Sequence, residues 1–173
     1  TDGQRLFYAP GFSALPLAQQ AGCVAHAVLH VALRHPQRFI DLQHRVGDVD
    51  LRLFNLCADA IVNSTLAELD WLQLPHGALT LDRLVEQTLG QTVTVDAALL
   101  QWDVESLYRA IDDRLPPEPN GKQPDARQGQ PGGGTASRPD GQRAAKARAM
   151  GQDQARDLLP DPASQGPPEA QAE

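Results

Sequence analysis

Two histidines four residues apart are the feature of this sequence that most directly predicts chemistry. His26 and His30 fall in a stretch, residues 16–34, whose apolar residues recur at helical spacing. In a helix, side chains four positions apart are separated by only about 40° around the axis, so both imidazoles project from one face. They can therefore reach a common metal ion.

The residue after the first histidine limits what such a metal ion could do. In the HExxH sites of zinc peptidases, the glutamate beside the first histidine is the general base toward the metal-bound water. Here the segment reads His26-Ala27-Val28-Leu29-His30, so Ala27 stands at the catalytic position of the missing general base. Loss of a positioned base typically costs about 100-fold to 10,000-fold in rate. We therefore expect peptide hydrolysis to be absent or strongly impaired.

The neighbours of the two histidines favour a metal site over two unrelated side chains. Histidines at this spacing more often have separate roles in the core or at the surface. In this stretch, however, the surrounding residues are mostly apolar, which predicts a buried helix: Val24, Ala25, Val28, Leu29, Val31 and Ala32. Two histidines on one stripe of a buried helix need polar partners, and a metal ion is an economical one.

A catalytic zinc ion takes a third protein ligand and leaves one position for water. Asp59 is the first candidate, because it lies on a second predicted helix that we expect to pack beside the first. His35 is the alternative third ligand. On a continuous helix it would point away from His30, but Pro36 disfavours helical geometry at His35 and could let it turn back.

Other polar side chains are weaker candidates for the same site. Cys23 falls on the face of the two histidines, although a buried structural thiol is the commoner role. Asn55 and Asn63 flank Asp59 at helical spacing and could orient ligands or substrate. Asn63 is therefore a candidate for substrate binding. So is Tyr8, which lies on a predicted edge strand suited to holding an extended peptide.

The secondary structure predicted around these residues indicates an α+β fold, mostly helical with a small N-terminal sheet. Residues 5–8 read as a strand, and residues 38–47 and 71–79 as loops. Helices are predicted at residues 16–34, 48–63, 81–89 and 95–115, and two consecutive prolines at 116 and 117 end the last of them.

The composition changes sharply near residue 115, which predicts a domain boundary. All eight aromatic residues precede residue 116, whereas ten of the fourteen prolines lie at residue 116 or beyond. We expect one domain at residues 1–115, a disordered Pro/Gly-rich linker at 116–139, a helix at 140–159 and a disordered tail at 160–173. The helix has a thin apolar face and is expected to dock onto something outside this chain. The start at Thr1, without methionine, predicts a truncated N-terminus.

The charge and the apolar pattern argue against two classes of partner. A net charge of -7 and a pI near 5.1 disfavour nucleic acid, whose binding draws on a basic surface. The longest apolar stretch, residues 24–33, contains both histidines and is too short to span a bilayer.

Two cysteines are too few for a disulfide framework and fit a reducing compartment, so we expect a cytoplasmic protein.

Four ordered blocks of the sequence resemble a known family. Residues 1–10, 25–35, 55–63 and 74–79 are similar to the bacterial putative metallopeptidase domain that precedes a von Willebrand factor A-like (VWA-like) domain. The resemblance covers roughly residues 1–115 and implies a zincin-like domain that binds Zn²⁺ and acts on a peptide or protein. Two positions depart from the family pattern, since Ala27 replaces a glutamate and Ala9 replaces a residue that is usually asparagine.

The resemblance also implies partners and a competing, non-enzymatic reading. Proteins of this family carry a C-terminal VWA-like domain, and their genes are often found near MoxR-type AAA+ ATPases. The alternative to an enzyme is therefore a pseudopeptidase, a protein-interaction module that works with a VWA-like domain and an AAA+ ATPase. In that case the metal only stabilises the fold.

Overall fold

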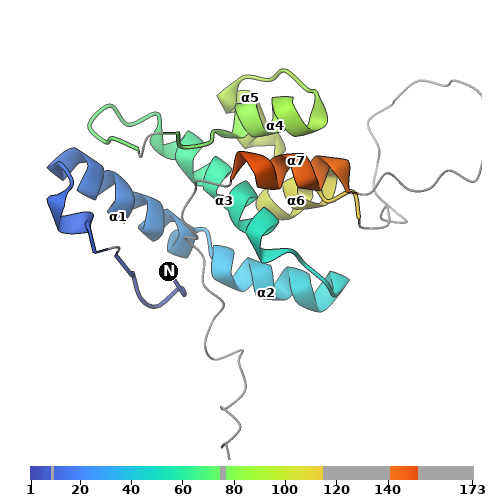
Figure 1. Ribbon diagram of the computed structural model, residues 1–173, viewed down its shortest axis with the longest axis horizontal. Coiled ribbons are helices and arrows are strands. Elements are labelled where there is room, and N and C mark those ends of the chain that lie inside the picture. The colour runs from blue at the N-terminus through green and yellow to red at the C-terminus, as the bar shows by residue number, and fades with distance from the viewer. Residues whose placement is uncertain (9, 75–76, 115–140, 152–173) are drawn as a thin grey trace, which may run out of the picture.

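The computed structural model describes residues 1–8, 10–74, 77–114 and 141–151, whose regular structure is helical (Figure 1). The elements follow in the order η1 (Phe12–Ala14), α1 (Leu17–Ala32), α2 (His35–Val46), α3 (Leu51–Leu66), α4 (Leu81–Leu89), α5 (Val95–Gln101), α6 (Val104–Ile111) and α7 (Gln142–Met150). Among these residues there is no strand, so the predicted α+β class with an N-terminal sheet is wrong.

The N-terminal segment folds back on itself instead of forming a strand. The Asp2 carboxylate accepts hydrogen bonds from the backbone N–H groups of Gln4 and Arg5, and the Thr1 hydroxyl donates to the Arg5 carbonyl oxygen. Local side chains thus satisfy backbone groups that a neighbouring strand would otherwise pair. The aromatic residues that suggested a strand, Phe7 and Tyr8, are exposed.

A helix, α2, occupies the segment that was predicted to be a loop at residues 38–47. Arg34 adopts a left-handed conformation (φ 57°) that separates α1 from α2, and Pro36 lies in the first turn of α2, where its missing N–H costs nothing. Phe39 and Leu42 are buried on the inner face. Burial of this apolar face stabilises a helix whose overall composition is polar.

The helix predicted at residues 95–115 is interrupted after seven residues. Asp103 accepts a hydrogen bond from the backbone N–H of Ser106, and the Ser106 hydroxyl accepts one from the backbone N–H of Asp103. This capping box begins α6 as a separate helix, so α5 does not continue into it. The predicted helix at residues 81–89 agrees with α4, whereas α3 begins three residues later than predicted, where Asp50 caps it.

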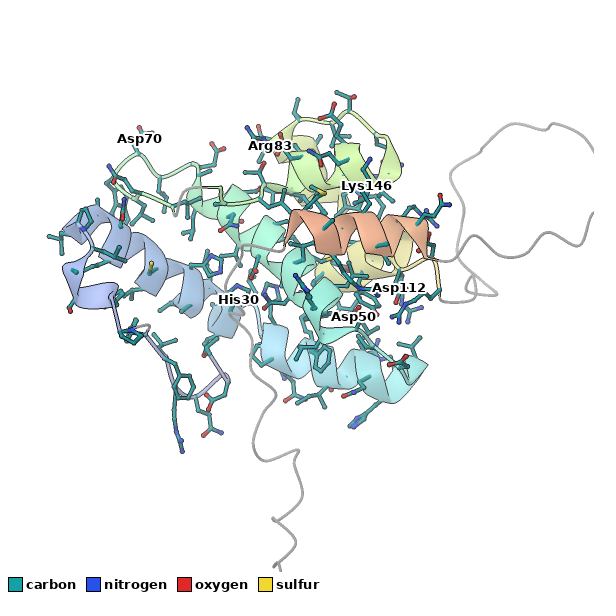
Figure 2. The ribbon with its side chains drawn as sticks, viewed as in Figure 1. His30, Asp50, Asp70, Arg83, Asp112 and Lys146 are labelled. Atoms are coloured by element: carbon teal, nitrogen blue, oxygen red, sulfur yellow. The ribbon has the colours of Figure 1, made fainter. Side chains whose placement is uncertain are left out.

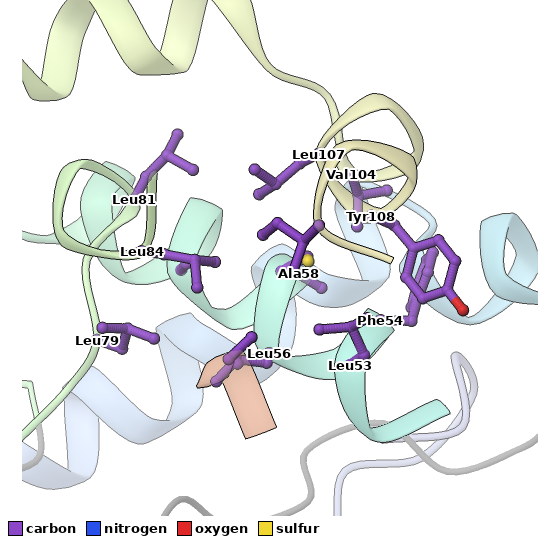
Figure 3. Packing of buried hydrophobic residues seen from close by; sticks show 14 of the residues in the cluster. Leu53, Phe54, Leu56, Ala58, Leu79, Leu81, Leu84, Val104, Leu107 and Tyr108 are labelled. Carbon is purple, nitrogen blue, oxygen red and sulfur yellow. The ribbon is translucent and has the colours of Figure 1, made fainter. Parts of the chain in front are cut away.

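Helix α3 lies at the centre of the fold, with α1 and α2 on one side and α4 to α7 on the other (Figure 1). It contributes Leu53, Phe54, Leu56 and Ala58 to the main core, where they pack against α4 and α6 (Figure 3). No residue of α3 from Leu53 to Ala60 is exposed. The polar side chains that α3 carries in this interval are therefore held in a fixed, water-poor environment.

Helix α7 packs on this core, although it follows the predicted domain boundary at residue 115. Ala144 and Ala147 are fully buried in the main core, and Arg148 forms an ion pair with Asp50 at 2.6 Å. The backbone N–H of Arg143 also donates to the Asp113 carboxylate at 3.0 Å. The expectation that this helix docks onto something outside the chain is therefore wrong. The predicted linker and tail lie outside the described residues.

A second, smaller cluster fixes α1 against α3. Val62, Leu66 and Leu72 are buried there against the inner face of α1. The segment after α3 approaches α1 so closely that a Cβ atom on Gly22 would lie 2.3 Å from the Gln73 carbonyl oxygen. Only glycine at position 22 permits this approach, which sets the spacing of the two helices that carry the predicted site residues.

None of the helices in the described part of the chain combines the length and the apolar character needed to cross a membrane.

Candidate metal centre

Two facing stripes of polar side chains form the site between α1 and α3. His26 and His30 lie one turn apart on α1, and Asn55, Asp59 and Asn63 lie at four-residue intervals on α3. The side chains of His30 and Asp59 are 0% and 2% exposed, and that of His26 is 12% exposed. Figure 2 shows His30 at the meeting point of α1, α2 and α3. The site is thus buried, with His26 as its most accessible ligand candidate.

Three donor atoms converge on one point in this site. The two Nε2 atoms of His26 and His30 are 2.9 Å apart, and Asp59 Oδ1 lies 3.5 Å from the first and 3.1 Å from the second. A tetrahedral ion with bonds of about 2.0 to 2.2 Å spaces its ligands by roughly 3.3 to 3.6 Å. The triangle of donors is therefore close to the size that a zinc ion requires, and small adjustments of the side chains suffice to complete it.

The hydrogen bonds of Asn63 determine which nitrogen of His26 carries the proton. Asn63 Nδ2 donates to the Leu79 carbonyl oxygen at 3.0 Å, which directs Asn63 Oδ1 toward His26 Nδ1, also at 3.0 Å. Because that oxygen can only accept, His26 Nδ1 must carry a hydrogen. A neutral His26 then presents the lone pair of Nε2 to the site, as a metal ligand must.

His35 packs behind His30, on the side away from the convergence point. His35 Nδ1 lies 3.1 Å from His30 Nδ1, and the rings meet edge to face with centroids 5.0 Å apart. Burial, reinforced by electrostatic interactions with His30 and Arg38, lowers the pKa of His35 to about 3. His35 is therefore neutral near pH 7 and is placed against His30 itself, outside the triangle of donor atoms.

Asp59 has one oxygen engaged by α3 and one directed at the histidines. Asn55 Nδ2 donates to Asp59 Oδ2 at 2.9 Å, whereas Oδ1 is buried without a hydrogen bond. Burial acts to raise the pKa of Asp59, but interactions with His26 and His30 outweigh it and leave the pKa below the ordinary value. A buried carboxylate oxygen that faces two imidazole nitrogens fits a cation well, because the cation would satisfy all three atoms.

The remaining predicted residues lie around this centre in different ways. Ala27 is half-buried on α1 and directly follows His26 in the chain, and Cys23 is half-buried one turn earlier. Asn63 is buried and uses its amide for His26 and Leu79. Tyr8 is exposed and packs against Phe12, with ring centroids 4.3 Å apart.

The sequence predicted that Asn55 could orient a ligand, but it did not predict the contact between His35 and His30. The four-residue spacing of Asn55 and Asp59 on one helix predicts that their side chains meet. It does not predict which oxygen of Asp59 accepts the hydrogen bond. The contact between His35 and His30 depends on the turn at Arg34, for which the sequence carries no comparable signal.

Comparison with known proteins gives one finding. A family model described as a putative metallopeptidase domain matches residues 1–173. No curated protein and no solved structure matches the chain.

Proposed function

Because the chain belongs to the family of putative metallopeptidase domains, we propose that it is a zinc-binding domain of peptidase type whose hydrolytic activity is lost or strongly impaired. The zinc ligands are His26, His30 and Asp59, and the substrate class is a peptide or protein. The observation that carries the proposal is the convergence of two Nε2 atoms and one unbonded carboxylate oxygen within 3.5 Å of one another.

The chemistry of the donor set supports zinc among the biological metal ions. Two imidazole nitrogens and one carboxylate oxygen are typical of catalytic zinc sites, which keep a fourth position for water or substrate. Magnesium and calcium prefer oxygen ligands, which makes them poorer matches. Ferrous iron also binds two histidines and one carboxylate, so metal analysis must distinguish it from zinc.

Each residue of this site has a separate role in the proposed function. A bound zinc ion supplies Lewis-acid polarisation of a carbonyl group and lowers the pKa of a water molecule. His26 and His30 present Nε2 lone pairs, and Asp59 supplies the negative charge. Asn63 and Asn55 hold His26 and Asp59 in orientation through single hydrogen bonds. At Ala27 a methyl group stands where a proton acceptor is needed, so the proton of the attacking water has no destination on this residue.

The absence of a base at Ala27 also favours a second candidate function. In this alternative the domain is a pseudopeptidase that binds a protein partner without cleaving it, and zinc stabilises the fold. A VWA-like domain and a MoxR-type AAA+ ATPase are the proposed partners in that case. We also place the protein in the cytoplasm, because two cysteines in the whole sequence are too few for a disulfide framework and fit a reducing compartment.

Restoring the base tests the proposal. Zinc-loaded Ala27→Glu should cleave an unfolded protein such as casein about 100-fold to 10,000-fold faster than the parent chain, since that is the usual contribution of a positioned base. Ala27→Gln is the matched control, because it adds nearly the same volume without a basic group. Cleavage must also disappear when zinc is removed with a chelator.

The outcomes separate the two candidate functions. About one zinc per chain together with proteolysis by Ala27→Glu supports a peptidase site that lacks only its base. Zinc binding with a silent Ala27→Glu supports the pseudopeptidase. A purified parent chain that takes up no zinc contradicts the metal site altogether.

A further inference from the structure

We propose that His35 is a positioning residue for the metal centre: it accepts a hydrogen bond from Nδ1–H of His30 and so directs the Nε2 lone pair of His30 at the ion. The inference rests on the proposed zinc site and adds to it the residue that selects the His30 tautomer. It assigns His35 a role different from that of a third ligand.

To bind a metal ion through Nε2, His30 must offer the lone pair of that nitrogen. A neutral imidazole carries one hydrogen, so a ring that offers a lone pair at Nε2 must carry its hydrogen at Nδ1. That N–H group is buried in a side chain with 0% exposure and needs an acceptor from the protein. The atom in place is His35 Nδ1, at 3.1 Å.

The position of His35 excludes it from the donor triangle itself. The convergence point lies at the Nε2 side of His30, where His26 Nε2 and Asp59 Oδ1 are 2.9 and 3.1 Å away. His35 contacts the opposite nitrogen of the same ring, so it supports the ligand from behind. Asn63 does the same for His26 through an amide oxygen 3.0 Å from Nδ1. Each histidine ligand therefore has its own buried acceptor.

The backbone conformation and the burial of α2 hold His35 against His30. Arg34 lies one turn after His30, and its left-handed conformation separates α1 from α2 and returns the chain toward His30. Pro36 and Phe39 are buried, which anchors the first turn of α2 and with it His35 at 1% exposure. Water cannot readily replace the imidazole at such a depth, so the acceptor for His30 must come from residue 35.

Zinc affinity in three variants tests the role. His35→Phe keeps an aromatic ring and removes the acceptor, whereas His35→Asn places an amide oxygen near the position of Nδ1. Zinc dissociation constants come from competition with a chromophoric chelator at pH 7.5. Loss of an outer-shell partner typically weakens metal binding about 10- to 100-fold, and we expect that loss for His35→Phe with recovery in His35→Asn. His44→Phe, on the exposed face of α2, should bind zinc as the parent does.

A second measurement does not depend on the stability of a variant. Nitrogen NMR of the zinc-loaded parent should show His30 protonated at Nδ1 and His35 protonated at Nε2. A His35 that carries its hydrogen at Nδ1 overturns the inference, as does His35→Phe binding zinc as tightly as the parent, or His35→Asn binding as weakly as His35→Phe. In these cases zinc still binds the parent and the proposed function stands. A parent that binds no zinc overturns both.

Discussion

Replacing Asp59 with asparagine separates its proposed role as a metal ligand from its role in the fold. In the native protein Asp59 Oδ2 accepts from Asn55 at 2.9 Å, and Oδ1 faces both histidines. In Asp59→Asn the side-chain oxygen can keep the Asn55 bond, which turns the new NH₂ group toward the two Nε2 atoms. That group donates two hydrogen bonds and offers no lone pair to a cation. We expect the metal-free variant to stay folded, within about 1 kcal/mol of the parent, and to bind zinc poorly.

The size of the effect follows from the linkage between binding and folding. Zinc at 100 times its Kd stabilises the parent by about 2.7 kcal/mol. Loss of a direct ligand should cost at least the upper end of what an outer-shell partner costs, or roughly 100-fold. At the same zinc concentration the stabilisation of Asp59→Asn then falls to about 0.4 kcal/mol. For a domain of this size, where 1 kcal/mol corresponds to roughly 3 to 5 °C, zinc should raise Tm by about 8 to 13 °C in the parent and by about 1 to 2 °C in the variant.

Thermal unfolding of chelator-treated protein, with and without added zinc, measures this difference. Asp96→Asn, which changes an exposed carboxylate on α5, is the matched control and should keep the full zinc shift. The reasoning is refuted if Asp59→Asn shows the same zinc-induced rise in Tm as the parent. It is also refuted if the metal-free variant is unfolded at 25 °C, because Asp59 would then serve chiefly to hold the fold together.

Three further changes test the structure that supports the site. Gly22→Ala should destabilise the protein by about 1 to 3 kcal/mol in urea unfolding, because its Cβ would lie 2.3 Å from the Gln73 carbonyl oxygen; Gly11→Ala, with open space around it, should have no such effect. The folded state lowers the pKa of His35 from 6.5 to about 3, so the unfolded state binds more protons between these values and the free energy of unfolding should fall as the pH drops from 6.5 toward 3. His35→Phe removes this titrating group and should flatten the pH dependence of the free energy of unfolding in metal-free protein. An unchanged pH profile contradicts the lowered pKa of His35. Asp103→Ala removes the cap of α6 and should cost about 1 kcal/mol, measured as a shift of the urea midpoint at constant slope.

The stripes that meet at the metal centre were predictable because each lies on one helix. A four-residue interval puts His26 and His30 on one face of α1, and the same interval aligns Asp59 with its asparagine neighbours on α3. These relations depend only on helical geometry, and the apolar residues around them are strong enough to predict both helices. The likeness to the metallopeptidase family, carried by the same blocks of residues, is confirmed by the family match.

Residue types and helical spacing were therefore enough to identify the side chains that could hold a metal ion and to show that Ala27 cannot supply a base. The orientation of these side chains depends on how the helices pack. The predicted strand at residues 5–8 would have needed a partner strand from elsewhere in the chain, and the described residues contain none. The left-handed conformation of Arg34 and the approach of Gln73 to Gly22 likewise depend on how the segments pack together. The contact between His35 and His30 is of the same kind, because it depends on a turn in the backbone that brings the ring of His35 behind that of His30.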